Sequence, residues 1–262
     1  MPNPTFDRLI DQAQRETFSG WDFSPIAGRM RESAVEWDYA ALIRRQLDAV
    51  DAVLDLGTGG GELLSSLAPL PARTVATEAY PPNVTVARQR LAPLGITVVQ
   101  VPGAPDNITI APGEGLNTLP FTDAAFPLVI NRHESYYPSE MFRIVAAGGS
   151  FLTQQVGGTH NQQLNQLLGA PPGYDPRWNL AFAARQLEAA SFLIQDRREA
   201  FPQTVFTDVG ALVYYLKAVP WQIPGFSVEQ YRDRLHAIHE RIQADGPLRI
   251  QGHFFYLAAV KR

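Results

Sequence analysis

Acidic and glycine residues between positions 55 and 78 have the types and spacing of a pocket for a cationic small molecule. Asp55 ends an apolar run, and Gly57, Gly59 and Gly61 follow it at alternate positions. Glu78 ends the next apolar run, 23 residues after Asp55. Glycines allow a turn to adopt positive φ and let the backbone approach a ligand closely. Two carboxylates beside such a turn attract an ammonium or sulfonium group and repel a phosphate.

The glycine spacing argues against a dinucleotide as the ligand. A dinucleotide-binding turn follows the pattern G-x-G-x-x-G, with a helix N-terminus directed at the pyrophosphate. Here the third glycine of that pattern is replaced by Glu62, whose carboxylate repels a pyrophosphate. An NAD(P)-dependent reductase is therefore a less favoured alternative, and an α/β protein with an unrelated glycine-rich loop is another.

Short apolar runs are expected to position these residues. The segments 53–56, 74–77, 96–101, 128–131 and 150–156 are apolar and follow glycine, proline or polar turns, a pattern typical of parallel strands covered by helices on both faces. In such sheets small molecules bind at the carboxyl ends of the strands. The connection 101–119 is rich in proline and glycine and long for a compact domain, which indicates a functional loop.

Two of these stretches resemble a known family. The string Asp55-x-Gly57-x-Gly59-x-Gly61 resembles the first motif of class I S-adenosylmethionine-dependent methyltransferases, in particular of the UbiE-like small-molecule branch. Residues 119–121 (Leu-Pro-Phe) and 126–129 match a later motif, although Pro127 replaces an acid and Glu114 lies one position further from Leu119 than is usual. The correspondence is nearly continuous over 53–156.

The resemblance implies a doubly wound, Rossmann-like α/β fold with a seven-stranded, mostly parallel sheet whose last strand is antiparallel. We expect an N-terminal helical flap in residues 1–50 and a methyltransferase domain in 51–262, within which 202–247 form a helical lid. In the flap, residues 21–31, beginning with Trp21, are expected to cover the cofactor, and Arg29 or Arg31 to meet a carboxylate. The alternative is that the aromatic residues of the flap simply cover one end of the sheet.

The family also implies a cofactor and a set of contacts. The cofactor is S-adenosyl-L-methionine, the product S-adenosyl-L-homocysteine, and the methyl acceptor a small molecule. The glycine turn would hold the methionine part, Glu78 the ribose hydroxyls, and the residues after Glu78 and around position 115 the adenine; Tyr80 could equally be an ordinary loop tyrosine. The end of the fourth strand would face the methyl group. The expected cofactor-binding residues are Asp55, Gly57, Thr58, Gly59, Gly61, Glu78, Ala79, Tyr80, Glu114, Gly115, Leu116, Asn131 and Arg132.

Histidines provide the candidates for proton transfer. Methyl transfer is an in-line displacement that depends mainly on positioning, and a general base helps when the acceptor carries a proton. His133 lies just after the fourth strand, and an imidazole pKa near ~6.5 suits such a base; the alternative is a capping or supporting hydrogen bond. His236 and His239 lack the spacing of a zinc-protease motif, so we expect a solvated helix face there and no metal.

The amino-acid composition argues against several classes of partner and location. The net charge is −4, which argues against nucleic acid as a partner because phosphate binding requires a basic surface. The chain has no cysteine, no apolar run long enough for a membrane span, and no signal-peptide pattern at its start, so we expect a cytoplasmic protein with neither disulfides nor a membrane anchor. A non-catalytic S-adenosylmethionine-binding protein is the main alternative to an enzyme. The sequence specifies neither the acceptor nor the oligomeric state.

Overall fold

The computed structural model describes residues 4–18, 22–111 and 113–262, so Trp21 of the expected flap lies outside the described residues. The chain forms two compact units. One comprises Glu36–Gly157, Arg177–Glu199 and Phe254–Arg262, and the other comprises Met1–Val35, Gly158–Pro176 and Ala200–His253. Each unit has its own sheet, and they are described separately below.

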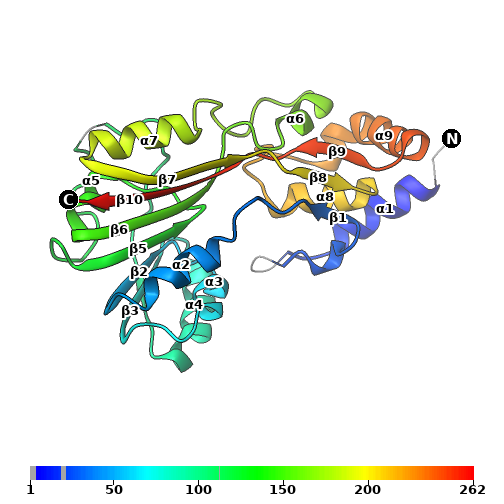
Figure 1. Cartoon of the computed structure of the whole chain (residues 1–262). Helices are drawn as coiled ribbons and strands as arrows, with labels where there is room; N and C mark the ends of the chain where they lie inside the picture. The colour runs from blue at the N-terminus through cyan, green and yellow to red at the C-terminus, as the bar shows by residue number, and fades with distance from the viewer. Residues whose placement is uncertain (1–3, 19–21, 112) are drawn as a thin grey trace. The chain divides into compact units, whose positions relative to one another are not determined.

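The first unit is built on a seven-stranded sheet with the order β4-β3-β2-β5-β6-β10-β7 (Figure 1). Pairing is parallel from β4 through β6, and β10 runs antiparallel to β6. This confirms the predicted sheet, including its antiparallel last strand. The strands are β2 (Ala52–Leu56), β3 (Arg73–Glu78), β4 (Thr97–Gln100), β5 (Phe126–Arg132), β6 (Val145–Val156), β7 (Phe192–Ala200) and β10 (Phe254–Lys261).

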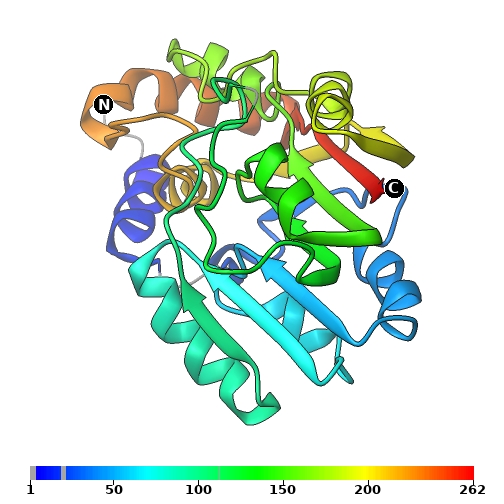
Figure 2. The same ribbon diagram turned by 90° about the vertical axis from the view of Figure 1, so that its left-hand side faces the viewer.

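Helices cover both faces of this sheet. Figure 1 shows α2, α3 and α4 gathered on one side and α5 and α7 on the other, and Figure 2 shows α4 running beside β4. Residues at the helix starts favour helix formation in several of these helices. At the start of α2 the Asp38 carboxylate accepts the Ala41 amide at 3.0 Å, and proline occupies the first turn of α4 and α5. The helices are α2 (Tyr39–Leu47), α3 (Glu62–Ser66), α4 (Pro81–Leu91), α5 (Pro138–Ile144) and α7 (Leu180–Ala189), with a 3₁₀ turn, η2 (Ala92–Leu94).

The core of this unit explains the apolar character of its central strands. All five residues of β2 are buried, because neighbouring strands flank it and helices cover both faces. Alternate residues of β10, beginning with Phe255, join the side chains of α5 and α7 in one apolar cluster. Trp178 packs edge-to-face on Phe255, with ring centroids 5.3 Å apart.

The second unit combines helices with a small antiparallel sheet in the order β1-β8-β9. Its strands are β1 (Met30–Glu32), β8 (Gln203–Phe206) and β9 (Leu248–Gln251), and its helical elements are α1 (Pro4–Arg15), η1 (Ser24–Ile26), α6 (Gln162–Leu168), α8 (Val209–Ala218) and α9 (Val228–Asp245). The grouping differs from the expected boundaries, since residues of the predicted flap and of the predicted lid form one unit with 158–176. The sheet itself was not predicted, because strands of three or four residues are too short to show alternation.

Helix α8 is the centre of the second unit. Every residue of α8 except Lys217 is buried, and the Lys217 ammonium donates to carbonyl oxygens at the end of α1, including that of Ala13 at 2.7 Å. Asp208 caps α8 by accepting the Ala211 amide, and Arg29 pairs with the same carboxylate through two nitrogen–oxygen contacts of 2.6 and 2.8 Å. Although α8 is strongly apolar, no helix in the described ranges is long enough and apolar enough to cross a bilayer.

The expectation of a solvated histidine face on α9 was wrong for one of the two residues. His239 is buried at 1% exposure and packs against Phe6, whereas His236 pairs with Glu240 at 3.6 Å. His239 follows Ile238 around the helix and so borders the apolar face, which the three-residue spacing alone did not reveal. No group of His, Cys, Asp and Glu side chains among the described residues is arranged to hold a metal ion.

Candidate functional site

The glycine turn after β2 is held in a left-handed conformation by backbone bonds to β3. Gly57, Gly59 and Gly61 have φ of 74°, 62° and 81°, values that side chains rarely adopt. The buried Thr58 donates its amide to the carbonyl of Thr77 at 2.8 Å, and Gly61 donates to the carbonyl of Thr58 at 3.0 Å. The turn is therefore fixed against the carboxyl end of β3 and continues directly into α3.

Glu78 fixes the same turn through its side chain. Its carboxyl group is buried at 4% exposure, and its two oxygens accept the amides of Gly59 at 2.7 Å and of Tyr80 at 2.8 Å. Hydrogen bonds from amides to a carboxylate are among the stronger ones in proteins. Each carboxylate oxygen has more than one acceptor position, so Glu78 retains the capacity to accept a ligand hydroxyl.

Asp55 lies at the end of β2 and is 3% exposed. Burial, together with a smaller contribution from the negative charge of Glu78, raises the pKa of its carboxyl group to about 6. Asp55 therefore contributes negative charge above pH 6 without lining the cavity beside the turn.

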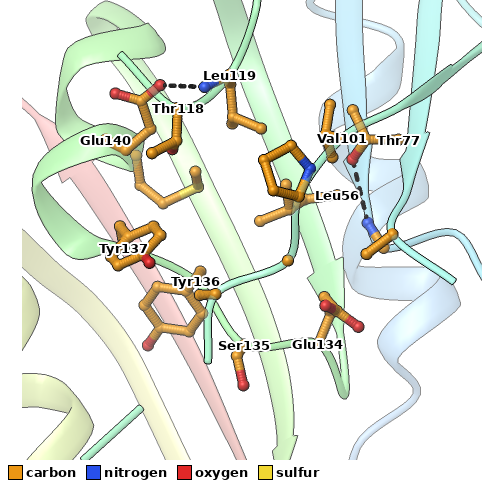
Figure 3. Close-up of a pocket in the computed structure, with 16 residues that line it drawn as sticks. Leu56, Thr77, Val101, Thr118, Leu119, Glu134, Ser135, Tyr136, Tyr137 and Glu140 are labelled. Atoms are coloured by element: carbon orange, nitrogen blue, oxygen red, sulfur yellow. Dashed lines mark hydrogen bonds between the residues drawn. The ribbon is translucent and has the colours of Figure 1, made fainter. Parts of the chain in front are cut away.

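A cavity opens at the carboxyl ends of β2, β3, β4 and β5. Its empty space, including the mouth that is open to solvent, is about 360 Å³. Figure 3 shows Glu134 and Ser135 at one end and Glu140 with Leu119 at the other. The lining residues are mainly apolar or hydroxyl-bearing: Leu56, Gly57, Thr77, Ala79, Val101, Pro102, Gly103, Ala104, Thr118, Leu119, Glu134, Ser135, Tyr136, Tyr137, Glu140 and Met141.

Buried side chains hold the long loop that forms one wall of the cavity. The side-chain oxygen of Asn107 accepts a hydrogen bond from the backbone amide of Tyr136 at 3.1 Å, and the backbone carbonyl of Asn107 accepts one from the side chain of Gln186 in α7 at 2.8 Å. Further along, Glu140 of α5 accepts the amides of residues 117 and 119 at 2.8 and 2.9 Å and pairs with Arg143 at 2.7 Å. These bonds order a connection that has no regular secondary structure of its own.

Solved structures share this architecture. A candidate methyltransferase from Bacillus halodurans C-125 is 20% identical, with 85% of this chain and 97% of that chain covered and a TM-score of 0.58. A protein of unknown function from Deinococcus radiodurans R1 is 16% identical over 99% and 100% of the two chains, with a TM-score of 0.54. The chain has the class I methyltransferase fold. No protein-family model and no curated protein sequence matches it.

The same fold also occurs in a protein with another named activity. The cyclase SpnF is 14% identical to this chain, with 98% of this chain and 94% of that chain covered and a TM-score of 0.54. At these identities the similarity establishes the methyltransferase fold, and the reaction has to be argued from the site.

Within this methyltransferase fold, the residues expected near adenine are only partly in the cavity. Ala79 lines it, whereas Tyr80 and Leu116 are 61% and 49% exposed. The exposed Glu114 accepts the amide of Ala111 at 2.8 Å and so closes its own turn. Gly115 packs under the ring of Tyr137, where a Cβ atom would approach the ring to 2.0 Å. The assignments to adenine stay predictions. Val101 to Ala104 also line the cavity; they lie in the predicted functional loop 101–119 but were not assigned individually.

Asn131 at the end of β5 supports the site without lining it. Its side chain is fully buried, donates to the carbonyl of Leu56 at 3.1 Å, and accepts from Thr153 and Gln155 at 2.7 and 2.6 Å. These bonds link β2, β5 and β6 where the cavity begins. Arg132, the next residue, is exposed and does not line the cavity.

His133 is exposed and lies outside the cavity lining. Its backbone has a φ of 64°, and its amide donates to the carbonyl of Gln154 at 2.8 Å. Its Nε2 lies 3.3 Å from the Gln154 side-chain nitrogen, and its ring is 5.8 Å from that of Phe254. The left-handed backbone at His133 turns the chain after β5, so that Glu134, two residues beyond the strand, enters the cavity.

Some of the residues that shape the cavity lie at positions without a motif. Gly103 lies three residues after the end of β4, in the loop 101–119 whose length and glycine and proline content indicated a function. Glu140 lies inside α5, and only the structure reveals that it anchors the loop before residue 120.

Proposed function

We propose that this chain binds S-adenosyl-L-methionine and transfers its methyl group to a small-molecule acceptor. The observation that carries the proposal is the charge of the cavity, whose lining in the described part of the chain contains carboxylates and no Lys, Arg or His. Such a site attracts a cationic nucleoside and disfavours a pyrophosphate. The methyltransferase fold and the glycine turn support the same assignment.

The residues present fit this cofactor. Gly57 and Gly59 expose backbone at the turn, and a Cβ atom at Gly59 would meet nothing within 4 Å. Glu78 has acceptor capacity for ribose hydroxyls beside that turn. The apolar surfaces of Val101 and Leu119 suit the faces of a purine ring.

S-adenosylmethionine supplies an electrophilic methyl group: the acceptor lone pair forms the new bond to carbon, the sulfur keeps the electrons of the broken bond, and S-adenosylhomocysteine leaves. The chain's own residues position the reactants and exclude water, which is sufficient for large accelerations. We propose that His133, which precedes the cavity residue Glu134 in the chain, takes up the proton that the acceptor loses. The atom methylated is oxygen, nitrogen or carbon.

Isothermal titration tests the binding step. We expect micromolar binding of S-adenosylhomocysteine and no measurable binding of NADH. NADH binding without nucleoside binding would instead favour a dinucleotide-dependent reductase and refute the proposal.

A second assay separates an enzyme from a non-catalytic binding protein. The purified chain is incubated with S-adenosylmethionine labelled in its methyl group and with fractionated metabolite extracts. We expect label to enter a small molecule in at least one fraction. Tight cofactor binding with no transfer to any fraction would favour the non-catalytic alternative.

A further inference from the structure

Glu134 is the unpartnered acid of the cavity. Among the described residues, two charged side chains line the cavity, and one of them, Glu140, is already paired with Arg143 and bonded to two backbone amides. Within the described part of the chain, the Glu134 carboxylate has neither a hydrogen bond nor an ion pair, although its backbone carbonyl accepts from Gln155. A half-buried carboxylate without a partner is unfavourable unless a ligand supplies the opposite charge.

The geometry places this carboxylate against the glycine turn. A Cβ atom on Gly57 would lie 2.4 Å from both Cβ and Cγ of Glu134, so the side chain runs directly across that glycine. Its Oε1 would lie 3.3 Å from a Cβ on Gly103, on the opposite wall. Glu134 thus occupies the space between the carboxyl ends of β2 and β4, at the end of the cavity that Figure 3 shows away from Glu140.

The surroundings make Glu134 responsive to a cation. Burial raises the pKa of its carboxyl group to about 7, and the negative charge of Glu78 contributes to the rise. The other ionisable groups that line the cavity are the phenols of Tyr136 and Tyr137 and the carboxyl group of Glu140, which is paired with Arg143. No cationic side chain lines the cavity within ranges 4–18, 22–111 and 113–262, so a positively charged ligand would shift Glu134 to its ionised form.

We propose that Glu134 is a specificity-determining residue, whose carboxylate distinguishes a positively charged sulfur from a neutral one. This inference rests on the proposed function. S-adenosylmethionine and S-adenosylhomocysteine share the adenosine and the amino-acid group, and they differ in one methyl group and in the charge on sulfur. An unpaired acid in the cavity therefore favours the substrate form over the product form. After transfer the sulfur is neutral, Glu134 regains its proton, and the product is held less tightly.

Titration of both nucleosides into the wild type and Glu134→Gln tests this at pH 8, where Glu134 is largely ionised. The substitution keeps the shape and removes the charge. We expect S-adenosylmethionine to bind about tenfold more weakly to Glu134→Gln, as for loss of a charged partner, and S-adenosylhomocysteine to change less than about twofold. The matched control is Glu62→Gln. Contrary to the expectation that Glu62 repels an anion at the turn, its carboxylate lies outside the cavity and is already paired with Arg90 at 3.0 Å, so this substitution should leave both affinities unchanged.

Proton release gives an independent readout. At pH 7, binding of S-adenosylmethionine to the wild type should release about half a proton, measured from titrations in buffers of different ionisation enthalpy, because Glu134 is about half protonated. Asp55, with a pKa of about 6, can contribute only about a tenth of a proton at this pH. Glu134→Gln should release almost none, and S-adenosylhomocysteine should release almost none from either protein.

The outcomes separate this inference from the proposed function. Equal weakening of both nucleosides in Glu134→Gln would assign the carboxylate to the shared amino group and overturn the inference. An unchanged affinity ratio with unchanged proton release would also overturn it while leaving the cofactor assignment intact. If neither nucleoside binds the folded wild type, the proposed function itself fails. Melting curves of Glu134→Gln and Glu62→Gln confirm that both variants are folded.

Discussion

Replacing Glu78 by alanine should damage both the glycine turn and cofactor binding. The change removes two charge-assisted hydrogen bonds, from the amides of Gly59 at 2.7 Å and Tyr80 at 2.8 Å. Each such bond contributes roughly 1.5–3 kcal/mol, so the gross loss is about 3–6 kcal/mol. Removing the charge also removes the repulsion between Glu78 and the carboxylates of Asp55 and Glu134, whose pKa values are raised partly by Glu78. We therefore expect a net local loss near the lower end of that range, about 3 kcal/mol.

In Glu78→Ala, the bound ligand loses the hydrogen bond between its ribose and the Glu78 carboxylate. One charge-assisted hydrogen bond of about 1.5–3 kcal/mol corresponds to a ten- to hundredfold weaker affinity for S-adenosylhomocysteine. Isothermal titration measures the affinity, and hydrogen exchange of the peptide containing residues 57–61 measures the loosening of the turn. Glu62→Ala is the matched control, because Glu62 is about half exposed and its pairing with Arg90 contributes roughly 0–1 kcal/mol. If Glu78→Ala binds and exchanges like Glu62→Ala, the assignment of Glu78 to the ribose and to the turn is wrong.

Three further predictions test neighbouring positions. Gly57→Ala should abolish nucleoside binding, because its Cβ atom would collide with Glu134. At Gly59 a Cβ atom would meet nothing within 4 Å, so Gly59→Ala should lower the unfolding free energy by only the ~1–2 kcal/mol of a left-handed alanine. Titration measures the binding of the two variants, and urea unfolding measures their stability. The carboxyl group of Asp55 has a raised pKa in the folded protein, so the stability that its protonated form contributes is lost as the pH rises from about 4 to about 6. Asp55→Asn should therefore reduce the difference between the unfolding free energies measured at pH 4 and pH 7 by up to about 3 kcal/mol. His133→Asn, which tolerates the φ of 64°, should keep nucleoside affinity and lower turnover at least about tenfold once an acceptor is identified, and undiminished turnover would reduce His133 to a turn residue.

The central sheet and the glycine turn were predictable because their signals are local. The central strand β2 is a short, fully buried run, and the turn from Gly57 carries its conformational requirement in its own residue types. Glu78 was predictable for the same reason, since it ends a strand next to that turn in the sheet. The turn and the position of Glu78 depend on short segments and on the pairing of β2 with β3, which follow one another in the chain.

The remainder depends on contacts between residues distant in sequence. The wall of the cavity is held by Asn107 and by Glu140, which bond to backbone about 21 to 29 positions away. In the second unit, β1 pairs with β8 through Met30 and Phe206, which no local pattern connects. The domain boundaries and the adenine contacts therefore could not be derived from periodicity, because they are decided by tertiary pairing.

Asp55, Glu78 and Glu134 supply negative charge near the glycine turn, and their carboxyl groups differ in burial and in hydrogen bonding. Asp55 is buried, and its carboxyl group ionises only near pH 6. Glu78 is bonded to two amides and cannot move without loosening the turn. Glu134 alone lines the cavity without a partner among the described residues, on a loop whose backbone is fixed by His133 and Gln155. A ligand cation can therefore be compensated by Glu134 without disturbing the scaffold, which is why charge discrimination and fold stability should separate in the variants above.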